Sequence, residues 1–450
     1  MVMRTKRRVF WSAVVAAILL LGPSAARATP SARPSLVLVT IDTLRADRLG
    51  AYGYHRDTTP TLDALAEEAV LFENAYTTMA TTLPAHASIM TGTYPLTHGV
   101  VANAAYLPRT LADAMSLRTL AEMLSDEGYV TAAFVSAAPL KRHSGINRGF
   151  TVFSQPVGLQ RSSTRTTNRA LEWVEQASPD EPFFLWVHYF DPHWPYSPPW
   201  RFRNQLGETG RLVSYLKRIG VGKSPSTKLI NANDAYDGEV LYTDTELGRL
   251  FDRLKERGLW DRSVVVATSD HGEGLGQHDY MYHGRIYNEQ LRVPLLIKLP
   301  GQSSGRRTRQ ITSVIDLLPI LSSVAALPIS EDDRGQFQGY DTLGSSFERD
   351  AVFSERTHRK GTWGPARRYA LTSLRWKLLH SPTEGDALYD LSVDPYEMRN
   401  VIDEHPEVAE EMLASLSERI RLHYREPDPD SANATDAETL KQLRALGYIE

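Results

Sequence analysis

The chain has 450 residues, of which 42% are hydrophobic and 23% charged, a composition that excludes disorder throughout and suits one large domain with or without a small one. The 50 Lys and Arg residues nearly balance the 54 Asp and Glu residues, and the formal net charge of −4 gives no field that would gather a nucleic acid. A nucleic-acid partner is therefore not expected, and an anionic substrate would have to be captured by a local site. There is no cysteine, which excludes disulfide bonds.

The first 28 residues have the three parts of a secretory signal peptide. Basic residues at Arg4 to Arg8 precede an apolar run from Val9 to Gly22, and Ala26-Arg27-Ala28 forms a cleavage pattern. The pattern predicts export to the periplasm or the medium, with a mature chain beginning near Thr29. The alternative is an uncleaved membrane anchor, although a run of about 14 residues is short for a span of about 20. Membrane contact is expected only in that case.

An alternation of strands and helices follows. Residues 35–41, SLVLVTI, form an unbroken apolar run typical of a buried strand in a parallel sheet. Thr59-Pro60 opens an amphipathic stretch that predicts a helix over 62–72. Further helices are expected at 118–127, 166–177 and 234–257, and further strands at 129–135, 183–188, 263–268 and 293–299. This order predicts an α/β fold with a doubly wound, mostly parallel sheet over residues 29–349.

From Asp350 the pattern changes to short strands. They are expected at 369–372, 376–379 and 388–395, followed by a helix at 407–424. We interpret residues 350–425 as a small α+β subdomain. Residues 426–450 are expected to form a linker rich in Pro, Asp and Ser and a last helix.

Chemistry-bearing side chains follow two of the predicted strands. Asp42 comes directly after the strand at 35–41, and Asp270 and His271 come directly after the strand at 263–268. A lone Asp would more often cap a turn. However, ligands gather at the carboxyl ends of parallel strands, and carboxylates with an imidazole form a set that a divalent metal accepts.

Residues 81–92, TTLPAHASIMTG, predict a helix with Pro84 in its first turn. The Thr82 hydroxyl would then lie at the amino end of the helix, where anions are favoured. The alternative is that Thr82 only caps the helix, and Thr81 is the neighbouring candidate for a nucleophile.

This motif resembles the nucleophile loop of the sulfatases, members of the alkaline phosphatase superfamily. In that family Cys or Ser, later oxidised to formylglycine, stands at the position of Thr82, and Arg stands at the position of His86. Because the chain has no cysteine, the Cys-dependent route to formylglycine cannot operate. The resemblance implies an alkaline phosphatase-like fold with a small antiparallel C-terminal subdomain. It also implies metal ligands at Asp42, Asp270 and His271, with His86 facing the substrate.

Two departures concern the metal. Thr43 replaces the second Asp that sulfatases usually show directly after the first. His271 stands at a position where sulfatases have Asn as often as His. Both favour zinc or manganese over calcium or magnesium, and they bring the chain closer to the phosphatase and phosphodiesterase branches. In this reading Thr82 is both a nucleophile and a metal ligand.

Residues 188–195, HYFDPHWP, are similar to a sulfatase element whose His touches the transferred group. The resemblance implies that His193 protonates the leaving alkoxide. Two-metal members of the superfamily place an Asp and a His ligand at this point of the chain, with wider spacing than Asp191 and His193 have. Asp191 is therefore a candidate ligand of a second metal.

Residues 276–289, GQHDYMYHGRIYNE, resemble the stretch where sulfatases have a His and then a Lys that bind substrate oxygens. His278 matches the His and is the other candidate general acid. His283 falls near the Lys position, where an imidazole would complete a second metal site. Arg285 is the nearest cation able to hold an anionic oxygen, unless it forms an exposed salt bridge.

These residues predict a metal-dependent hydrolase of phosphate, phosphonate or sulfate esters that uses one or two metal ions. Thr82 would form a covalent intermediate that water resolves, and the anionic ester substrate would be glycan- or lipid-linked in some cases. One alternative is a transferase that moves phosphoethanolamine or phosphoglycerol to envelope glycans or lipids, although such enzymes usually carry several membrane helices. Another is an inactive envelope protein on a sulfatase scaffold. Four aromatic residues are candidates for a sugar or aromatic subsite, or for loop packing: Trp194, Tyr196, Trp200 and Trp363.

Overall fold

The computed structural model describes residues 33–109, 116–203, 205–207, 209–344, 349–356 and 367–424. The predicted signal peptide, the predicted linker and last helix, and Trp363 lie outside these ranges. Within them, no helix combines the length and the apolar character needed to span a membrane.

A nine-stranded sheet forms the centre of the fold, in the order β11-β2-β10-β6-β1-β5-β3-β4, with β9 also paired to β2. The strands are β1 (Ser35–Ile41), β2 (Val70–Tyr76), β3 (Val130–Phe134), β4 (Val152–Ser154), β5 (Phe183–Tyr189), β6 (Ser263–Ser269), β9 (Arg292–Val293), β10 (Leu295–Lys298) and β11 (Arg306–Ser313). Among them only β9 and β10 run antiparallel to their neighbours. The predicted mostly parallel sheet is thus confirmed.

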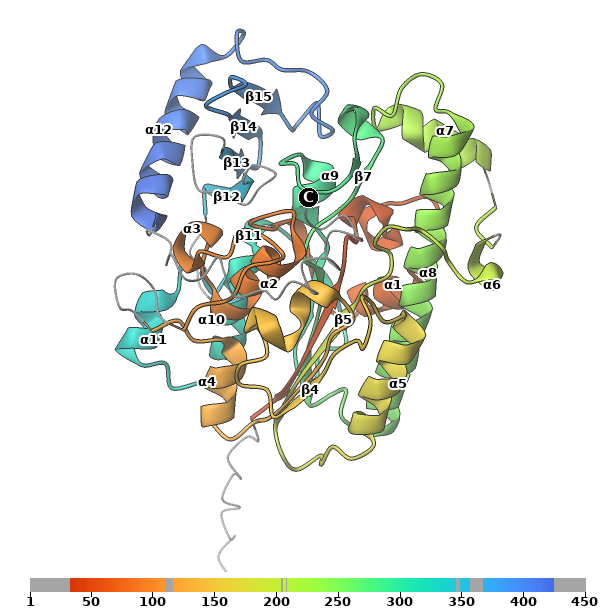
Figure 1. Cartoon of the computed structure of the whole chain (residues 1–450), viewed down its shortest axis with the longest axis vertical. Coiled ribbons are helices and arrows are strands. Elements are labelled where there is room, and N and C mark those ends of the chain that lie inside the picture. Colours follow the sequence, from red (N-terminus) through yellow and green to blue (C-terminus); the bar gives the residue numbers. More distant parts are fainter. Residues whose placement is uncertain are drawn as a thin grey trace, which may run out of the picture. The chain divides into compact units, whose positions relative to one another are not determined.

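Helices cover both faces of this sheet (Figure 1). Val37 and Val39 of β1 pack in a cluster with α1 (Pro60–Ala66), α5 (Ser163–Val174) and α8 (Thr227–Glu256). Leu36 and Leu38, on the opposite face, pack in a cluster with α2 (Thr82–Thr91), α4 (Leu120–Asp126) and α10 (Leu317–Val324). Because β1 is buried on both faces, its sequence is apolar without alternation.

Several expected elements have other bounds in the structure: the helix predicted over 234–257 begins at Thr227, and the strand predicted over 388–395 ends at Asp390. The helix predicted over 62–72 ends early, since α1 stops at Ala66 and β2 begins at Val70. Pairing of β2 with β10 and β11, which lie more than 200 residues later, decides this boundary. The strand predicted over 293–299 is divided at Pro294, which has no N–H to donate to a ladder.

A second, antiparallel sheet has four strands in the order β12-β13-β14-β15. Its strands are β12 (Ala351–Arg356), β13 (Arg368–Ser373), β14 (Trp376–His380) and β15 (Ala387–Asp390), and α12 (Pro406–His423) packs on it. The remaining elements are α3 (Pro95–His98), α6 (Trp200–Arg203), α7 (Thr209–Arg218), α9 (Asn288–Leu291), α11 (Glu331–Gln336) and the hairpin of β7 (Gly274–Leu275) and β8 (Met281–Tyr282). Short 3-10 helices lie at Ala46–Arg48, Gly50–Tyr52, Ala138–Leu140, Arg142–Ser144, Gln277–Asp279 and Val314–Asp316.

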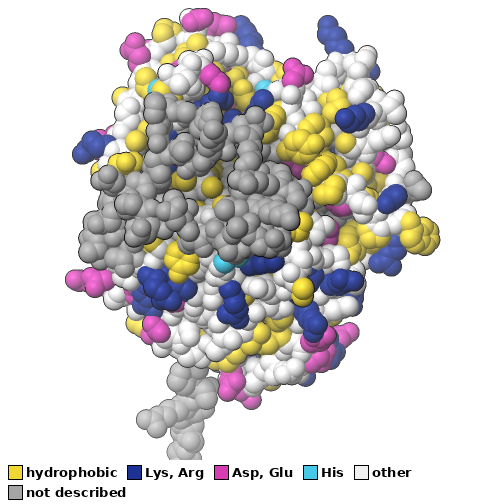
Figure 2. Space-filling model, viewed as in Figure 1, with side chains coloured by type: hydrophobic (Ala, Val, Ile, Leu, Met, Phe, Trp, Pro, Cys, Tyr) yellow, Lys and Arg dark blue, Asp and Glu magenta, His cyan; other side chains and the backbone are white. Residues whose placement is uncertain are grey.

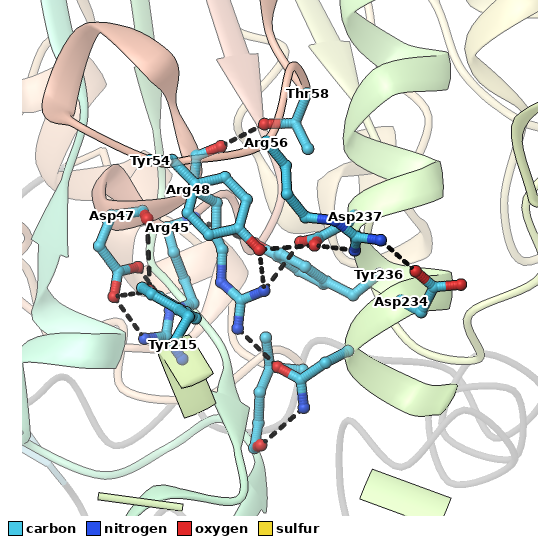
Figure 3. A network of polar contacts seen from close by, with 12 residues as sticks. Arg45, Asp47, Arg48, Tyr54, Arg56, Thr58, Tyr215, Asp234, Tyr236 and Asp237 are labelled. Atoms are coloured by element: carbon cyan, nitrogen blue, oxygen red, sulfur yellow. Dashed lines mark hydrogen bonds and ion pairs between the residues drawn. The ribbon is translucent and has the colours of Figure 1, made fainter. Parts of the chain in front are cut away.

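A buried polar network ties the segment after β1 to α8 (Figure 3). The Asp237 carboxylate of α8 accepts hydrogen bonds from the Arg48 guanidinium (2.8 Å), the Arg56 guanidinium (2.7 Å) and the Tyr54 hydroxyl (2.6 Å). The neighbouring Tyr236 hydroxyl also contacts this segment. The network therefore holds in place the chain that leaves β1, where the candidate site begins.

Candidate active site

The register of the central sheet brings Asp42 and Asp270 together. Strands β1 and β6 are parallel neighbours with Ile41 opposite Ser269, so the next residue of each strand reaches the same edge. His271 Nε2 lies 3.9 Å from Asp42 Oδ1 and 3.6 Å from Asp270 Oδ2. The three side chains are fully buried, and their ligand atoms lie within 4.8 Å of one another. We call Asp42, Asp270 and His271 the primary cluster.

The primary cluster has polar atoms without partners. Both carboxylate oxygens of Asp42, Asp270 Oδ2 and His271 Nε2 are buried and make no hydrogen bond within the described part of the chain. Buried polar atoms are normally paired, so an unpaired group of this kind needs an explanation. His271 Nδ1 lies 2.8 Å from the carbonyl oxygen of Gly272, to which it donates, which leaves the Nε2 lone pair facing the carboxylates. This donor set fits a divalent cation.

The pKa shifts of the primary cluster are consistent with a bound divalent cation. Burial, followed by repulsion from Asp270 and Glu273, raises the pKa of Asp42 well above its usual value. Burial also raises the pKa of Asp270 to about 6 and lowers that of His271 to about 3. Burial therefore disfavours the charged forms, and a cation among these atoms would offset that cost for the carboxylates while using the neutral imidazole.

Thr82 is the first residue of α2 and does not cap it. Thr81 occupies the N-cap position, without a side-chain hydrogen bond to the helix. The Thr82 hydroxyl is fully buried and has no hydrogen-bond partner among the residues that the structure describes. His86 Nδ1 lies 2.8 Å from the Thr82 carbonyl oxygen and 3.7 Å from Asp270 Oδ2, so the first turn of α2 lies beside the primary cluster. Of the two adjacent threonines, the structure buries Thr82 completely and leaves Thr81 half-buried.

His86 has a supporting position, which corrects the expectation that it faces the substrate. Trp186 Nε1 donates to Thr40 Oγ1 (3.0 Å), and the Thr40 hydroxyl is then free to donate to His86 Nε2 (3.0 Å). Nδ1 consequently carries the proton and donates to the Thr82 carbonyl oxygen. With both ring nitrogens used inside the protein, His86 has no donor left for a substrate oxygen. Burial lowers its pKa and keeps the ring neutral.

A second group of side chains lies next to the primary cluster. His283 Nδ1 is 3.3 Å from Glu273 Oε1, and the His283 ring centroid is 4.5 Å from that of His271 and 5.0 Å from that of His193. We call His193, Glu273 and His283 the second cluster. His193 Nδ1 donates to the carbonyl oxygen of Trp194 at 2.5 Å, so its Nε2 is the unprotonated nitrogen of the neutral ring.

Burial governs the charges of the second cluster as well. It raises the pKa of Glu273 to about 7 and lowers the pKa of His283 to about 4. The pKa of His193 is lowered to about 3, first by burial and then by His283. Two neutral imidazoles with a carboxylate are a set that a second cation also accepts.

Asp191 and His278 are engaged with other groups than those of the two clusters, which differs from the roles expected for them. Asp191 Oδ2 accepts two hydrogen bonds at 2.8 Å, from the backbone N–H and the hydroxyl of Ser163 at the start of α5. His278 is stacked on Tyr287, with ring centroids 3.7 Å apart. Both nitrogens of His278 are engaged, one with Glu289 Oε1 (3.2 Å) and one with the carbonyl oxygen of Glu397 (3.1 Å). Asp191 is thus bonded to the start of α5, and His278 is bonded in part to the C-terminal part of the chain.

Arg285 is also occupied. Its guanidinium lies over the Tyr280 ring at 3.9 Å, and its Nη1 donates to the carbonyl oxygen of His278 at 3.1 Å. Substrate binding by Arg285 would therefore require these contacts to be exchanged, and the prediction is not supported by this geometry.

Three residues near the site were not among the predicted ones. Glu273 follows His271 by two positions, within the same motif, and could have been found from that proximity. His188 is the penultimate residue of β5, and its Nε2 lies 3.7 Å from Asp42 Oδ2. Tyr236 of α8 donates to the carbonyl oxygen of Thr43 (2.8 Å) and accepts from the backbone N–H of Arg45 (3.0 Å), a contact that no local pattern indicates.

Thr43 has a special backbone conformation. Its φ of 57° lies in the left-handed region, which is unfavourable for a β-branched residue. Its N–H donates to Asp270 Oδ1 at 3.2 Å. The hydrogen bond from Tyr236 to the Thr43 carbonyl thus helps to hold a strained residue that in turn orients a carboxylate of the primary cluster.

Comparisons with known proteins agree with the fold. The sulfatase family model matches residues 34–327, and the model of the N-sulphoglucosamine sulphohydrolase C-terminal region matches residues 276–425. An arylsulfatase of Clostridium perfringens is 24% identical over 451 residues, covering 82% of this chain and 90% of the relative.

Solved structures are similar over most of the chain. A phosphonate monoester hydrolase of Agrobacterium radiobacter has a TM-score of 0.69 and 23% identity, and the match covers 86% of this chain and 96% of the other. A putative sulfatase from Bacteroides fragilis has a TM-score of 0.73 and 22% identity, with 91% and 99% covered. The fold is therefore alkaline phosphatase-like, as predicted. Since the family model matches more than half of the residues, the chain belongs to the sulfatase family.

Proposed function

We propose that this protein is a metal-dependent hydrolase of sulfate, phosphate or phosphonate esters in which Thr82 is the nucleophile. The observation that carries the proposal is the buried, unpartnered set formed by the Thr82 hydroxyl and the primary cluster. The family match and the similarity to a phosphonate monoester hydrolase support ester hydrolysis as the reaction class. Asp42, Asp270 and His271 would hold the cation, with Thr82 as an additional ligand.

The residues of the chain have distinct tasks in this scheme. When bound, a divalent cation supplies positive charge that lowers the pKa of a nearby hydroxyl and offsets the charge of an anionic ester. Thr82 Oγ1 attacks the sulfur or phosphorus atom, forming a new ester bond as the bond to the leaving alcohol breaks, and the proton that the hydroxyl gives up balances the proton that the leaving alkoxide takes up. Water then cleaves the Thr82 ester and restores the hydroxyl. His86 holds the Thr82 backbone in position through its Nδ1–H.

The second cluster has two possible roles that metal analysis separates. With neutral rings at His193 and His283 and a carboxylate at Glu273, it would hold a second cation. Alternatively, His193 Nε2 would carry the proton that the leaving alkoxide takes up, with an anionic substrate raising its pKa. Two metal ions per chain in the wild type, and one in Glu273→Gln, would support the first role, whereas one in both would support the second.

The function is tested with a panel of aryl sulfate, phosphate monoester, phosphodiester and phosphonate substrates. We expect the wild-type protein with zinc or manganese to hydrolyse at least one of them in water alone. Thr82→Ala should lose about 1,000-fold or more in kcat because the covalent route is removed, whereas the control Thr81→Ala should retain most activity. Full activity of Thr82→Ala would refute the nucleophile assignment. Turnover that requires an added acceptor alcohol would indicate a transferase.

We further propose that the protein is exported. The support is the sequence pattern of residues 1–28. Cell fractionation and determination of the mature amino terminus test this, and a terminus near Thr29 is expected. A cytoplasmic protein that keeps its first residues would contradict export, and an uncleaved protein in the membrane fraction would indicate an anchor.

A further inference from the structure

A short hairpin carries two of the three residues of the second cluster. Glu273 directly precedes β7, and His283 directly follows β8, which pairs with β7. The tip between the two strands has an unfavourable backbone, because His278 and Asp279 have φ values of 51° and 52°, in the left-handed region. A strained tip of this kind persists only where surrounding contacts hold it. Tyr280, also at the tip, donates its hydroxyl hydrogen bond to the carbonyl oxygen of His283 at 2.9 Å, so a shift of the tip would reach the second cluster.

The His278 ring holds this tip against other parts of the chain. Its Nε2 lies 3.1 Å from the carbonyl oxygen of Glu397, and its Nδ1 lies 3.2 Å from Glu289 Oε1. A carbonyl oxygen and an ionised carboxylate only accept hydrogen bonds, so both ring nitrogens donate and the ring is an imidazolium. Burial alone would lower the pKa of His278, but the hydrogen bond to Glu289 and the charges of Glu289 and Glu397 raise it. The ring also stacks on Tyr287 with an interplanar angle of 8°.

The residue that accepts from His278 Nε2 is itself fixed by the C-terminal sheet, which lies beside β7 and α9 (Figure 1). Glu397 follows β15, and its carboxylate forms an ion pair with Lys377 of β14 (2.6 Å) and accepts from the Asn288 N–H of α9 (2.6 Å). The side chains of Lys377 and Glu397 are fully buried, and those of Glu289 and His278 are 5% and 11% exposed.

Most other charges have a different setting. On the face shown in Figure 2, basic and acidic side chains are interspersed over the surface, where water screens them. Buried partners, by contrast, are costly to separate, because each would be left without a counter-charge. The buried charges around His278 therefore form a firm link between the hairpin tip and the C-terminal sheet.

We propose that His278 is a positioning residue for the reaction, which ties the hairpin tip to the C-terminal sheet and thereby fixes the second cluster in place. The proposal rests on the ester hydrolase function proposed above. Thr82 attacks from the side of the primary cluster, and in an in-line displacement the leaving oxygen lies opposite the nucleophile. The second cluster then acts on the leaving oxygen in either of its two roles. His278 should therefore matter most for esters whose leaving alkoxide is strongly basic.

The first measurement compares phenyl and 4-nitrophenyl esters of whichever acid the wild type hydrolyses. Phenoxide is the more basic leaving group and needs more stabilisation than 4-nitrophenoxide. We expect His278→Gln, whose new side chain carries no charge, to lower kcat/KM by about 10- to 100-fold for the phenyl ester and by about threefold at most for the 4-nitrophenyl ester. A variant that only lost folded protein would lower both to the same extent. Glu289→Gln removes the partner charge and should act in the same direction, and it carries the test if His278→Gln does not fold.

The second measurement is hydrogen exchange followed by mass spectrometry on the intact proteins. In His278→Gln the segment 273–283 should exchange about 10-fold faster, whereas β1 and β6 should exchange as in the wild type. The matched control is His380→Gln, which should change neither measurement. His380 resembles His278 in that it bonds to a carboxylate, Asp386 Oδ1 at 2.8 Å, and stacks on a tyrosine, Tyr369, but these partners belong to the C-terminal sheet and one of its turns.

The outcomes separate this proposal from the function. The proposal requires both changes, so equal losses on the two esters, or wild-type exchange in the segment 273–283, would refute it even if the wild type is a good hydrolase. The same changes in His380→Gln would refute it as well, because they would show a general effect of removing a paired histidine. If the wild type hydrolyses no ester, the proposed function fails, whereas the exchange measurement still decides whether His278 fixes the hairpin.

Discussion

Replacing Asp237 by Asn is predicted to destabilise the fold by about 3–5 kcal/mol, the usual cost of breaking a buried ion pair. The Asp237 carboxylate is fully buried, and the two guanidinium groups that it pairs with, those of Arg48 and Arg56, are at most 1% exposed. It also accepts the Tyr54 hydroxyl hydrogen bond. In the variant the two guanidinium groups lose a shared counter-charge, and the amide N–H₂ faces hydrogen-bond donors (Figure 3).

Urea unfolding followed by tryptophan fluorescence and by far-UV circular dichroism measures the effect. The matched control is Glu175→Gln, since Glu175 pairs with Arg253 at the surface, where the two side chains are 46% and 33% exposed. We expect no resolvable change in the control because exposed pairs are screened by water and salt. If Asp237→Asn unfolded at the same urea concentration as the control, the network would not be holding the segment after β1 in the way we describe.

Further predictions concern the site and its surroundings. Tyr236→Phe should lower kcat/KM by about 10- to 100-fold, because the Thr43 carbonyl loses its hydrogen bond. Its loss of stability should be similar to that of the control Tyr242→Phe on the same helix, since each change removes a hydroxyl with two hydrogen bonds, and equal effects of the two variants on kcat/KM would contradict this. Asp42→Asn should retain less than about a tenth of the bound metal, measured by mass spectrometry of the purified protein, and wild-type metal content would contradict the primary cluster as its site. Burial lowers the pKa of His98 to about 3 in the folded state. The unfolded chain therefore takes up a proton at His98 below about pH 6.5 that the folded chain does not, and this one group should lower stability by about 1.4 kcal/mol per pH unit as pH decreases towards 4. His98→Asn should reduce this acid sensitivity in thermal unfolding from pH 7 to pH 4, and an unchanged slope would contradict the assignment.

Some of the site was predictable because its signals are local. A buried strand has a recognisable apolar run, and the residue after it lies at the edge where ligands gather. Asp42, Asp270 and His271 were found in this way, and the parallel register of β1 and β6 brings them together as expected. The position of Thr82 at the start of α2 also followed from a local pattern of helix formation.

Other roles depended on partners that are distant in sequence. The region from Val70 to Phe72 continues an amphipathic pattern, but it forms β2 because its partners in the sheet are β10 and β11. Asp191 satisfies the start of α5, and His278 bonds to residues 11 and 119 positions away. Sequence spacing alone offered no means of distinguishing these engaged side chains from free ones.

The amino-acid sequence by itself determined the alternating architecture and the strand-end residues of the primary cluster, because short-range periodicity and burial decide both. Only the tertiary structure decided which histidines remain near that cluster. Glu273 and His283 flank the β7–β8 hairpin and meet His193, from a segment distant in sequence, through packing. His86 is turned towards Thr40 and Thr82 by a chain of hydrogen bonds. Hydrogen-bond partners are set by distance in space, and the residues that supply them here lie on different strands and helices.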